Sequence, residues 1–234
     1  MNRLFGSSLY VRPATSRTMN ERPSPRWKTG DSFVLAAITA TASHLYRLTP
    51  FAVAERVLFC GAPTSFFFVD LWVLSNLGIS VVAWLLMSPT IGGMWQWLLV
   101  VYGAWRVFDV CVYNLRVILG AHSKIPEPNT VRSTRRSLLL GLLNYIEVLF
   151  WFAAFYRFIS ASFGQNSDFV STVTGSFYFS ILTMATYGDI TPSTIATRWL
   201  VAVHLAIALF LTLIVLARFV SLLPRPKSLD ETEK

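Results

Sequence analysis

The sequence has 234 residues, of which 54% are hydrophobic and 14% charged, and a formal net charge of +8. Soluble domains usually carry about 25% charged residues, so this composition excludes a soluble globule and indicates a membrane protein. A helix needs about 20 apolar residues to cross hydrocarbon, which leaves room for several spans but for no large soluble domain. The basic residues lie in polar segments between apolar runs, a pattern that fits membrane topology rather than nucleic-acid binding.

The amino-terminal part divides into a polar tail and a helical segment. Residues 1–31 carry six basic residues among Pro, Ser and Asn, and we expect a solvated basic tail in the cytoplasm. Its apolar runs are too short for a cleavable signal peptide. Residues 32–62 begin with an apolar run that His44, Arg47 and Arg56 interrupt, so this segment predicts an interfacial or amphipathic helix rather than a span.

Four later stretches are long and apolar enough to cross a membrane. They lie at about 65–88, 92–119, 137–161 and 198–223. The first two predict a transmembrane hairpin over residues 63–119. The loop 120–136 is basic and the loop near 88–92 is uncharged, which places the basic loop, both termini and the tail 224–234 in the cytoplasm. The predicted fold class is therefore an all-α, multi-pass protein of the cell membrane, in contact with membrane lipids.

The segment 162–197 then lies on the outer side and contains its own apolar stretch, Phe169 to Met184. This stretch is too short to span and too apolar to sit in water. A re-entrant helix that enters the membrane and returns as a loop satisfies both limits, provided that the loop is buried in protein or lines a water-filled cavity.

The returning loop carries the most specific motif of the chain. It reads Thr-Met-Ala-Thr-Tyr-Gly-Asp over residues 183–189 and is followed by Pro192. It resembles the pore loop of the potassium-channel superfamily, whose pattern is T-x-x-T-x-G-Y-G-D followed shortly by Pro. The resemblance covers 137–223 and implies a pore module of outer helix, pore helix, filter and inner helix. One chain contributes one loop, and the resemblance implies a homotetramer.

The resemblance implies that the ion selectivity filter consists of Thr186, Tyr187, Gly188 and Asp189, supported by Thr183 and Ala185 in the pore helix. Rings of backbone carbonyls and a threonine hydroxyl can replace the water shell of a cation. Gly188 supplies backbone freedom for turning a carbonyl toward the axis, and Asp189 adds negative charge at the outer mouth. The expected metals are permeant monovalent cations, K⁺ or Na⁺, at the filter alone, and no cofactor is expected.

The loop also departs from the family pattern. Thr186 is followed directly by Tyr-Gly-Asp, two residues short of the potassium-selective sequence. It looks more like the short Thr-Ile-Gly-Glu filter of cyclic-nucleotide-gated channels, which discriminate little between sodium and potassium. Fewer coordination sites generally mean weaker selection, so we expect weak selectivity. A potassium-selective pore of altered geometry, a non-conducting pore fold and a hairpin that merely packs remain alternatives.

The last span predicts an inner pore helix. If the alignment with the family continues without a gap, Leu209, Thr212 and Leu216 face the pore at helical spacings of three and four. Leucine rings can close a pore by dewetting, although each leucine could equally pack against a neighbouring helix. His204 could sense protons or could be a hydrogen-bonded packing residue.

Charged residues also fall inside the predicted spans, among them Asp70, Arg106, Asp109, Arg116 and Glu147. Charges in hydrocarbon normally face a partner, so we expect structural ion pairs, with Asp70 near Arg116 and Glu147 near Arg106. A voltage sensor would need several arginines at every third position, a pattern that the second span lacks. The three histidines lie in separate segments without metal-ligand spacing, so the sequence does not predict an enzyme.

Overall fold

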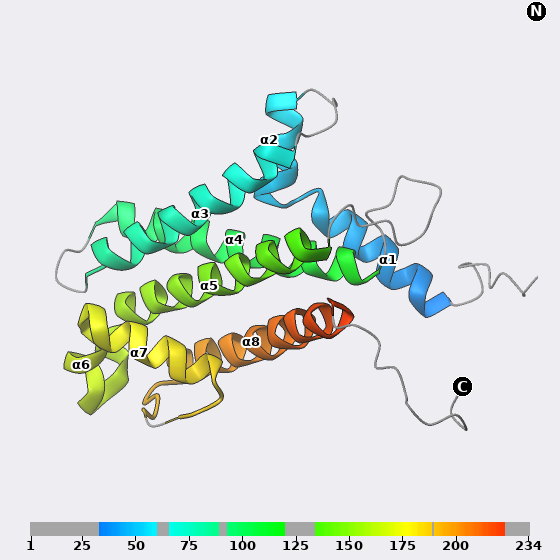
Figure 1. Ribbon diagram of the computed structural model, residues 1–234. Helices are drawn as coiled ribbons and strands as arrows, with labels where there is room; N and C mark the ends of the chain where they lie inside the picture. Colours follow the sequence, from blue (N-terminus) through cyan, green and yellow to red (C-terminus); the bar gives the residue numbers. More distant parts are fainter. Residues whose placement is uncertain (1–32, 60–65, 89–92, 120–133, 189, 223–234) are drawn as a thin grey trace, which may run out of the picture.

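The computed structural model describes residues 33–59, 66–88, 93–119, 134–188 and 190–222, and all regular elements in these ranges are helices (Figure 1). The expected basic tail 1–31, the carboxy-terminal tail and Asp189 lie outside the described residues. Within these ranges four helices are long and apolar enough to cross a membrane, which confirms the predicted all-α fold with four long apolar helices. They are α3 (Phe66–Leu86), α4 (Met94–Ile118), α5 (Thr134–Phe158) and α8 (Ile195–Leu222).

The segment before the first span forms two helices, α1 (Phe33–Tyr46) and α2 (Pro50–Phe59). Pro50 begins α2 because its fixed φ suits the first turn of a helix and its missing N–H needs no partner there. The turn between the two helices is held by α4, where Trp105 Nε1 donates to the Leu48 carbonyl at 2.7 Å. Neither helix has the length of a span, and both contact α4.

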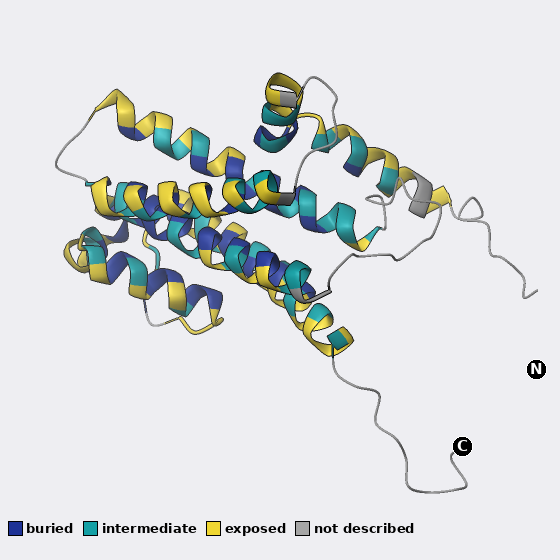
Figure 2. Cartoon of the chain, turned by 45° about the horizontal axis from the view of Figure 1, so that its top comes forward, coloured by how far each residue is buried: buried dark blue, intermediate teal, exposed yellow. Residues whose placement is uncertain are grey.

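Helix α5 forms the centre of the bundle. In its most apolar window 56% of the residues are buried, against 22% in α3 and in α8. Figure 1 shows α5 between the α3–α4 hairpin on one side and α7 (Val173–Met184) and α8 on the other. Figure 2 shows broad exposed faces on the outer helices. These faces are apolar, as expected for helices that meet lipid or other subunits.

A buried charge cluster joins α4 to α5. Arg106 Nη1 lies 2.6 Å from Asp109 Oδ2, and Arg106 Nε lies 2.8 Å from Glu147 Oε1. The three side chains are at most 4% exposed. The cluster therefore links α4 to the central helix.

The partner expected for Asp70 was wrong. Asp70 Oδ1 lies 2.5 Å from Arg136 Nη2, at the matching ends of α3 and α5. Arg116 instead places its guanidinium carbon 3.8 Å from the centre of the Tyr46 ring, a favourable contact between a cation and the face of an aromatic ring. Depth along the spans suggested the pair Asp70–Arg116, but helix rotation decides which charges meet.

Candidate ion-conducting site

The approach to the re-entrant helix is a tight succession of short helices. A 3₁₀ helix (Ser160–Asn166) and α6 (Ser167–Ser171) lead into α7, whose N-cap residue Thr172 accepts the Gly175 N–H at 2.9 Å. A Cβ on Gly175 would lie 1.9 Å from the Phe169 carbonyl oxygen. Only glycine fits here, and it lets the chain turn sharply into α7.

Helix α7 is fixed to its neighbours at several points. Trp84 of α3 donates from Nε1 to the Val173 carbonyl at 3.2 Å and to Ser176 Oγ at 3.1 Å. The Trp84 ring also lies 5.1 Å from the Phe177 ring. On the other side, Ser180 Oγ donates to the Leu149 carbonyl of α5 at 2.7 Å. The start and the middle of α7 are thus held by two spans of the same chain.

Arg157, which the sequence reasoning did not select, joins the same end of the bundle. Its Nη1 donates to the carbonyls of Trp84 and Leu85, each at 2.9 Å, and its Nε donates to the Ser171 carbonyl at 2.9 Å. The last carbonyls of a helix lack partners within the helix, so a cation placed there satisfies them. One side chain therefore connects α5, the end of α3 and the entrance to α7. Its position at the end of a span was the only signal in the sequence.

Helix α7 ends in a tight cap at the predicted filter. The Thr186 N–H donates to the Thr183 carbonyl at 3.1 Å, and the Tyr187 N–H donates to the Leu182 carbonyl at 2.8 Å. This pair of bonds is a Schellman motif, whose left-handed residue is usually glycine. Here that residue is Thr186, with φ of 60°. The positive φ thus occurs at Thr186 and not at Gly188, where the sequence analysis expected the backbone freedom.

Residues 185–188 after the helix are all exposed in the single chain. The Tyr187 side chain is 64% exposed, and a Cβ on Gly188 would meet no atom within 4 Å. Thr183, by contrast, is buried and donates from Oγ1 to the Phe179 carbonyl at 2.8 Å. The structure therefore places the predicted supporting threonine inside the subunit and leaves the loop residues 185–188 exposed.

The three residues predicted to line the inner pore lie on an exposed side of α8. Leu209 is 48% exposed and Leu216 is 54% exposed. Thr212 Oγ1 lies 3.4 Å from the Tyr145 hydroxyl of α5, so this side chain leans toward its own outer helix. His204 lies inside the packed core, fully buried, with its ring 3.8 Å from the Phe152 ring.

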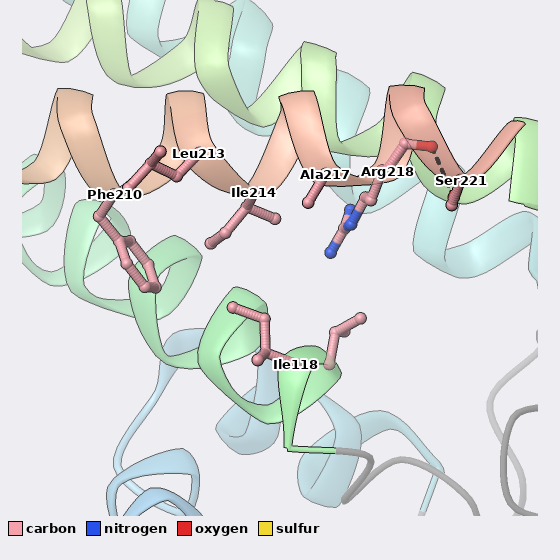
Figure 3. Close-up of a pocket in the computed structure, with 8 residues that line it drawn as sticks. Ile118, Phe210, Leu213, Ile214, Ala217, Arg218 and Ser221 are labelled. Carbon is pink, nitrogen blue, oxygen red and sulfur yellow. Dashed lines mark hydrogen bonds between the residues drawn. The ribbon is translucent and has the colours of Figure 1, made fainter. Parts of the chain in front are cut away.

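A groove separates the end of α4 from α8, with a cavity volume of about 510 Å³. Figure 3 shows Ile118 of α4 facing Phe210 and Ile214 of α8 across it, with the Arg218 side chain projecting into the gap. Arg218 is held by the Ser137 carbonyl at 3.0 Å and by Asn114 Oδ1 at 3.1 Å. Arg218 therefore joins this half of α8 to α4 and α5 by hydrogen bonds.

Within the part of the chain that the structure describes, no group of three or more His, Cys, Asp or Glu side chains could hold a metal ion. Residues 145–225, about a third of the chain, match a family model described as an ion channel. No curated protein and no solved structure matches the chain. The matched segment runs from α5 through α7 and the exposed loop to α8, and the matched family consists of channels, not enzymes. Residues 145–225 are therefore similar to an ion channel domain with a pore module of the potassium-channel type, in a multi-pass membrane protein.

Proposed function

We propose that the protein is a homotetrameric channel that conducts monovalent cations passively through a short filter, Thr186-Tyr187-Gly188-Asp189, with weak discrimination between sodium and potassium. The observation that carries the proposal is the exposed loop 185–188, which follows a capped re-entrant helix inside the segment that matches an ion channel. Exposed backbone at membrane depth is unfavourable unless it lines a water-filled cavity. Four copies around an axis provide such a cavity.

The cap at the end of α7 supports a short ion-binding row. It uses the carbonyls of Leu182 and Thr183 for hydrogen bonds within the subunit. The oxygens left for a cation are the Thr186 hydroxyl and the carbonyls that follow the cap. The C-terminal end of α7 carries a partial negative charge, which favours a cation nearby. Fewer layers of oxygen give weaker selection.

The inner part of the pathway is also a proposal. Leu209, Thr212 and Leu216 face the axis from α8 and form apolar and hydroxyl rings below the filter. The two Leu side chains are about half exposed in one chain, which leaves them free to meet copies of themselves. The charge pairs of the spans, among them Arg106 with Glu147, serve to hold α4 against the pore module. Both termini face the cytoplasm.

Purified protein reconstituted in planar bilayers, with sodium on one side and potassium on the other, tests the proposal directly. We expect cation currents with a reversal potential near zero. A reversal potential near the potassium equilibrium potential would contradict weak selectivity and favour a potassium-selective filter of altered geometry. No current from a correctly assembled tetramer would favour a non-conducting protein with a pore fold.

A matched pair of glycine variants locates the filter. Gly188→Ala and Gly78→Ala each add a methyl group where one chain has open space within 4 Å. Neither should therefore disturb the fold of the subunit. We expect Gly188→Ala to change the sodium-to-potassium permeability ratio and Gly78→Ala, in α3, to leave it unchanged. If both variants have the same permeability ratio, the selectivity filter does not lie in this loop.

A further inference from the structure

The groove between the end of α4 and α8 has the size of a ligand pocket. Its volume of about 510 Å³ lies within the range of about 300–1,000 Å³ that ligand pockets in proteins have. Six of the eight described residues that line it are apolar: Val117, Ile118, Phe210, Leu213, Ile214 and Ala217. Such a lining offers ordered water too few polar partners. The groove therefore suits a hydrocarbon chain.

The groove lies on its own side of α8. Its lining residues on this helix recur at spacings of three and four from Phe210 to Ser221, which places them on one face. At about 100° per residue, this face is turned by roughly 140° from the face that carries Leu209, Thr212 and Leu216. A molecule in the groove therefore does not occupy the proposed pore.

Arg218 supplies a positive charge to this apolar groove, and its side chain projects into the gap (Figure 3). It donates to two neutral acceptors, the Ser137 carbonyl at 3.0 Å and Asn114 Oδ1 at 3.1 Å. The ion pairs among the described residues do not include Arg218. A guanidinium group has five N–H donors, so these two bonds leave three donors for an anion. Ser221, the other polar residue of the lining, donates its hydroxyl to the Arg218 carbonyl at 2.6 Å within α8.

The position of Arg218 along α8 matches that of a lipid phosphate. Arg218 precedes Leu222, the last residue of α8, by four residues, or about 6 Å along the helix axis. Long basic side chains near the ends of spans reach the headgroup region. The loop 120–136, which joins α4 to α5 at this end of the bundle, has four basic residues and one acidic residue in its sequence. Basic segments at the ends of spans attract anionic lipids.

We propose that the groove between α4 and α8 binds one anionic phospholipid per subunit, with an acyl chain along the apolar lining and the phosphate on Arg218. The anionic headgroup complements the cation, and the acyl chain covers the apolar face, so each half of the ligand matches one part of the site. The proposal does not depend on cation conduction, because binding is measured without current.

Native mass spectrometry of the purified, delipidated protein in detergent counts the lipids that it binds. Phosphatidylglycerol and phosphatidylcholine with the same acyl chains are added separately at increasing concentrations. We expect one phosphatidylglycerol per subunit, with an affinity about tenfold above that of phosphatidylcholine, whose own cation competes with Arg218 for the phosphate. Glycerol phosphate, which has the charge without the acyl chains, should not bind.

Substitutions in the groove remove the charge and the apolar space separately. Arg218→Gln removes the charge and should abolish the preference for phosphatidylglycerol over phosphatidylcholine. Arg218→Lys keeps the charge and should retain that preference, although a lysine does not reproduce the geometry of the guanidinium group. Ala217→Trp fills the groove and should remove the bound lipid while the arginine stays in place.

The matched controls lie on the same helix. Arg198→Gln removes an arginine at the other end of α8, where its Nε donates to the Pro192 carbonyl at 3.3 Å. Val203→Trp enlarges an exposed residue about two turns before Phe210, on the same face but outside the groove. Both controls should bind phosphatidylglycerol like the unmodified protein.

Equal affinities of the unmodified protein for the two lipids, or unchanged binding of phosphatidylglycerol to Ala217→Trp, would overturn the proposal. Binding of glycerol phosphate as tightly as phosphatidylglycerol would assign the site to a free anion and overturn it as well. Loss of the assembled oligomer in Ala217→Trp but not in Val203→Trp would show that the groove is a contact between subunits, which also contradicts a lipid site. If Arg218→Gln does not fold, the comparison of Ala217→Trp with Val203→Trp decides.

Discussion

Replacing Arg106 by Met tests the buried charge cluster most severely. The substitution keeps a long apolar side chain but leaves Asp109 and Glu147, 1% and 0% exposed, without their cation. Removing one partner of a buried ion pair costs about 3–5 kcal/mol, because the remaining charge is stranded away from water. The loss should be at the upper end of that range, since two carboxylates of like charge remain.

The assay is thermal unfolding of the purified protein in one detergent, with assembly checked by size. A loss of this size should lower the unfolding temperature by about 10 °C in a chain of this length. The control is Asp70→Asn, which breaks a pair whose side chains are 33% and 45% exposed. Exposed pairs contribute about 0–1 kcal/mol, so the control should unfold within about 3 °C of the unmodified protein. If both variants lower the unfolding temperature equally, burial does not determine how much an ion pair contributes to stability here. Adding Glu147→Gln to Arg106→Met should recover part of the loss.

Three further substitutions probe the region around α7. Gly175→Ala should destabilise the chain by about 3 kcal/mol in the same assay, because its Cβ would overlap the Phe169 carbonyl, and a normal unfolding temperature would contradict this. Arg157→Met should speed hydrogen exchange at the end of α3 and the start of α7 while exchange in the middle of α5 stays slow; unchanged exchange at both ends would show that the arginine holds neither. Thr186→Gly should raise stability by about 1 kcal/mol by relieving the left-handed strain, and a loss of stability would argue against strain at this residue.

The sequence by itself determined the elements that depend on local hydropathy. The four spans were predicted to within a few residues at most ends, because a run of about 20 apolar residues has one stable arrangement in hydrocarbon. The re-entrant helix was predicted because its apolar run is too short to cross a membrane and too apolar for water. In the structure this helix begins at Val173. The threonine and glycine spacing of the loop pointed to the same kind of protein, an ion channel, as the family model that matches residues 145–225.

The tertiary structure decided which side chains meet. Asp70 pairs with Arg136, 66 residues away, because the rotation of α3 and α5 about their axes sets their contact faces. Near-uniform apolarity carries little periodic signal about that rotation. For the same reason the sequence did not predict the contacts of Arg157 and Trp84 or the contact between Tyr156 and His204. Each of these contacts joins helices that are far apart in the chain. Hydropathy therefore specifies how many helices cross, and packing specifies how those helices hold the loop.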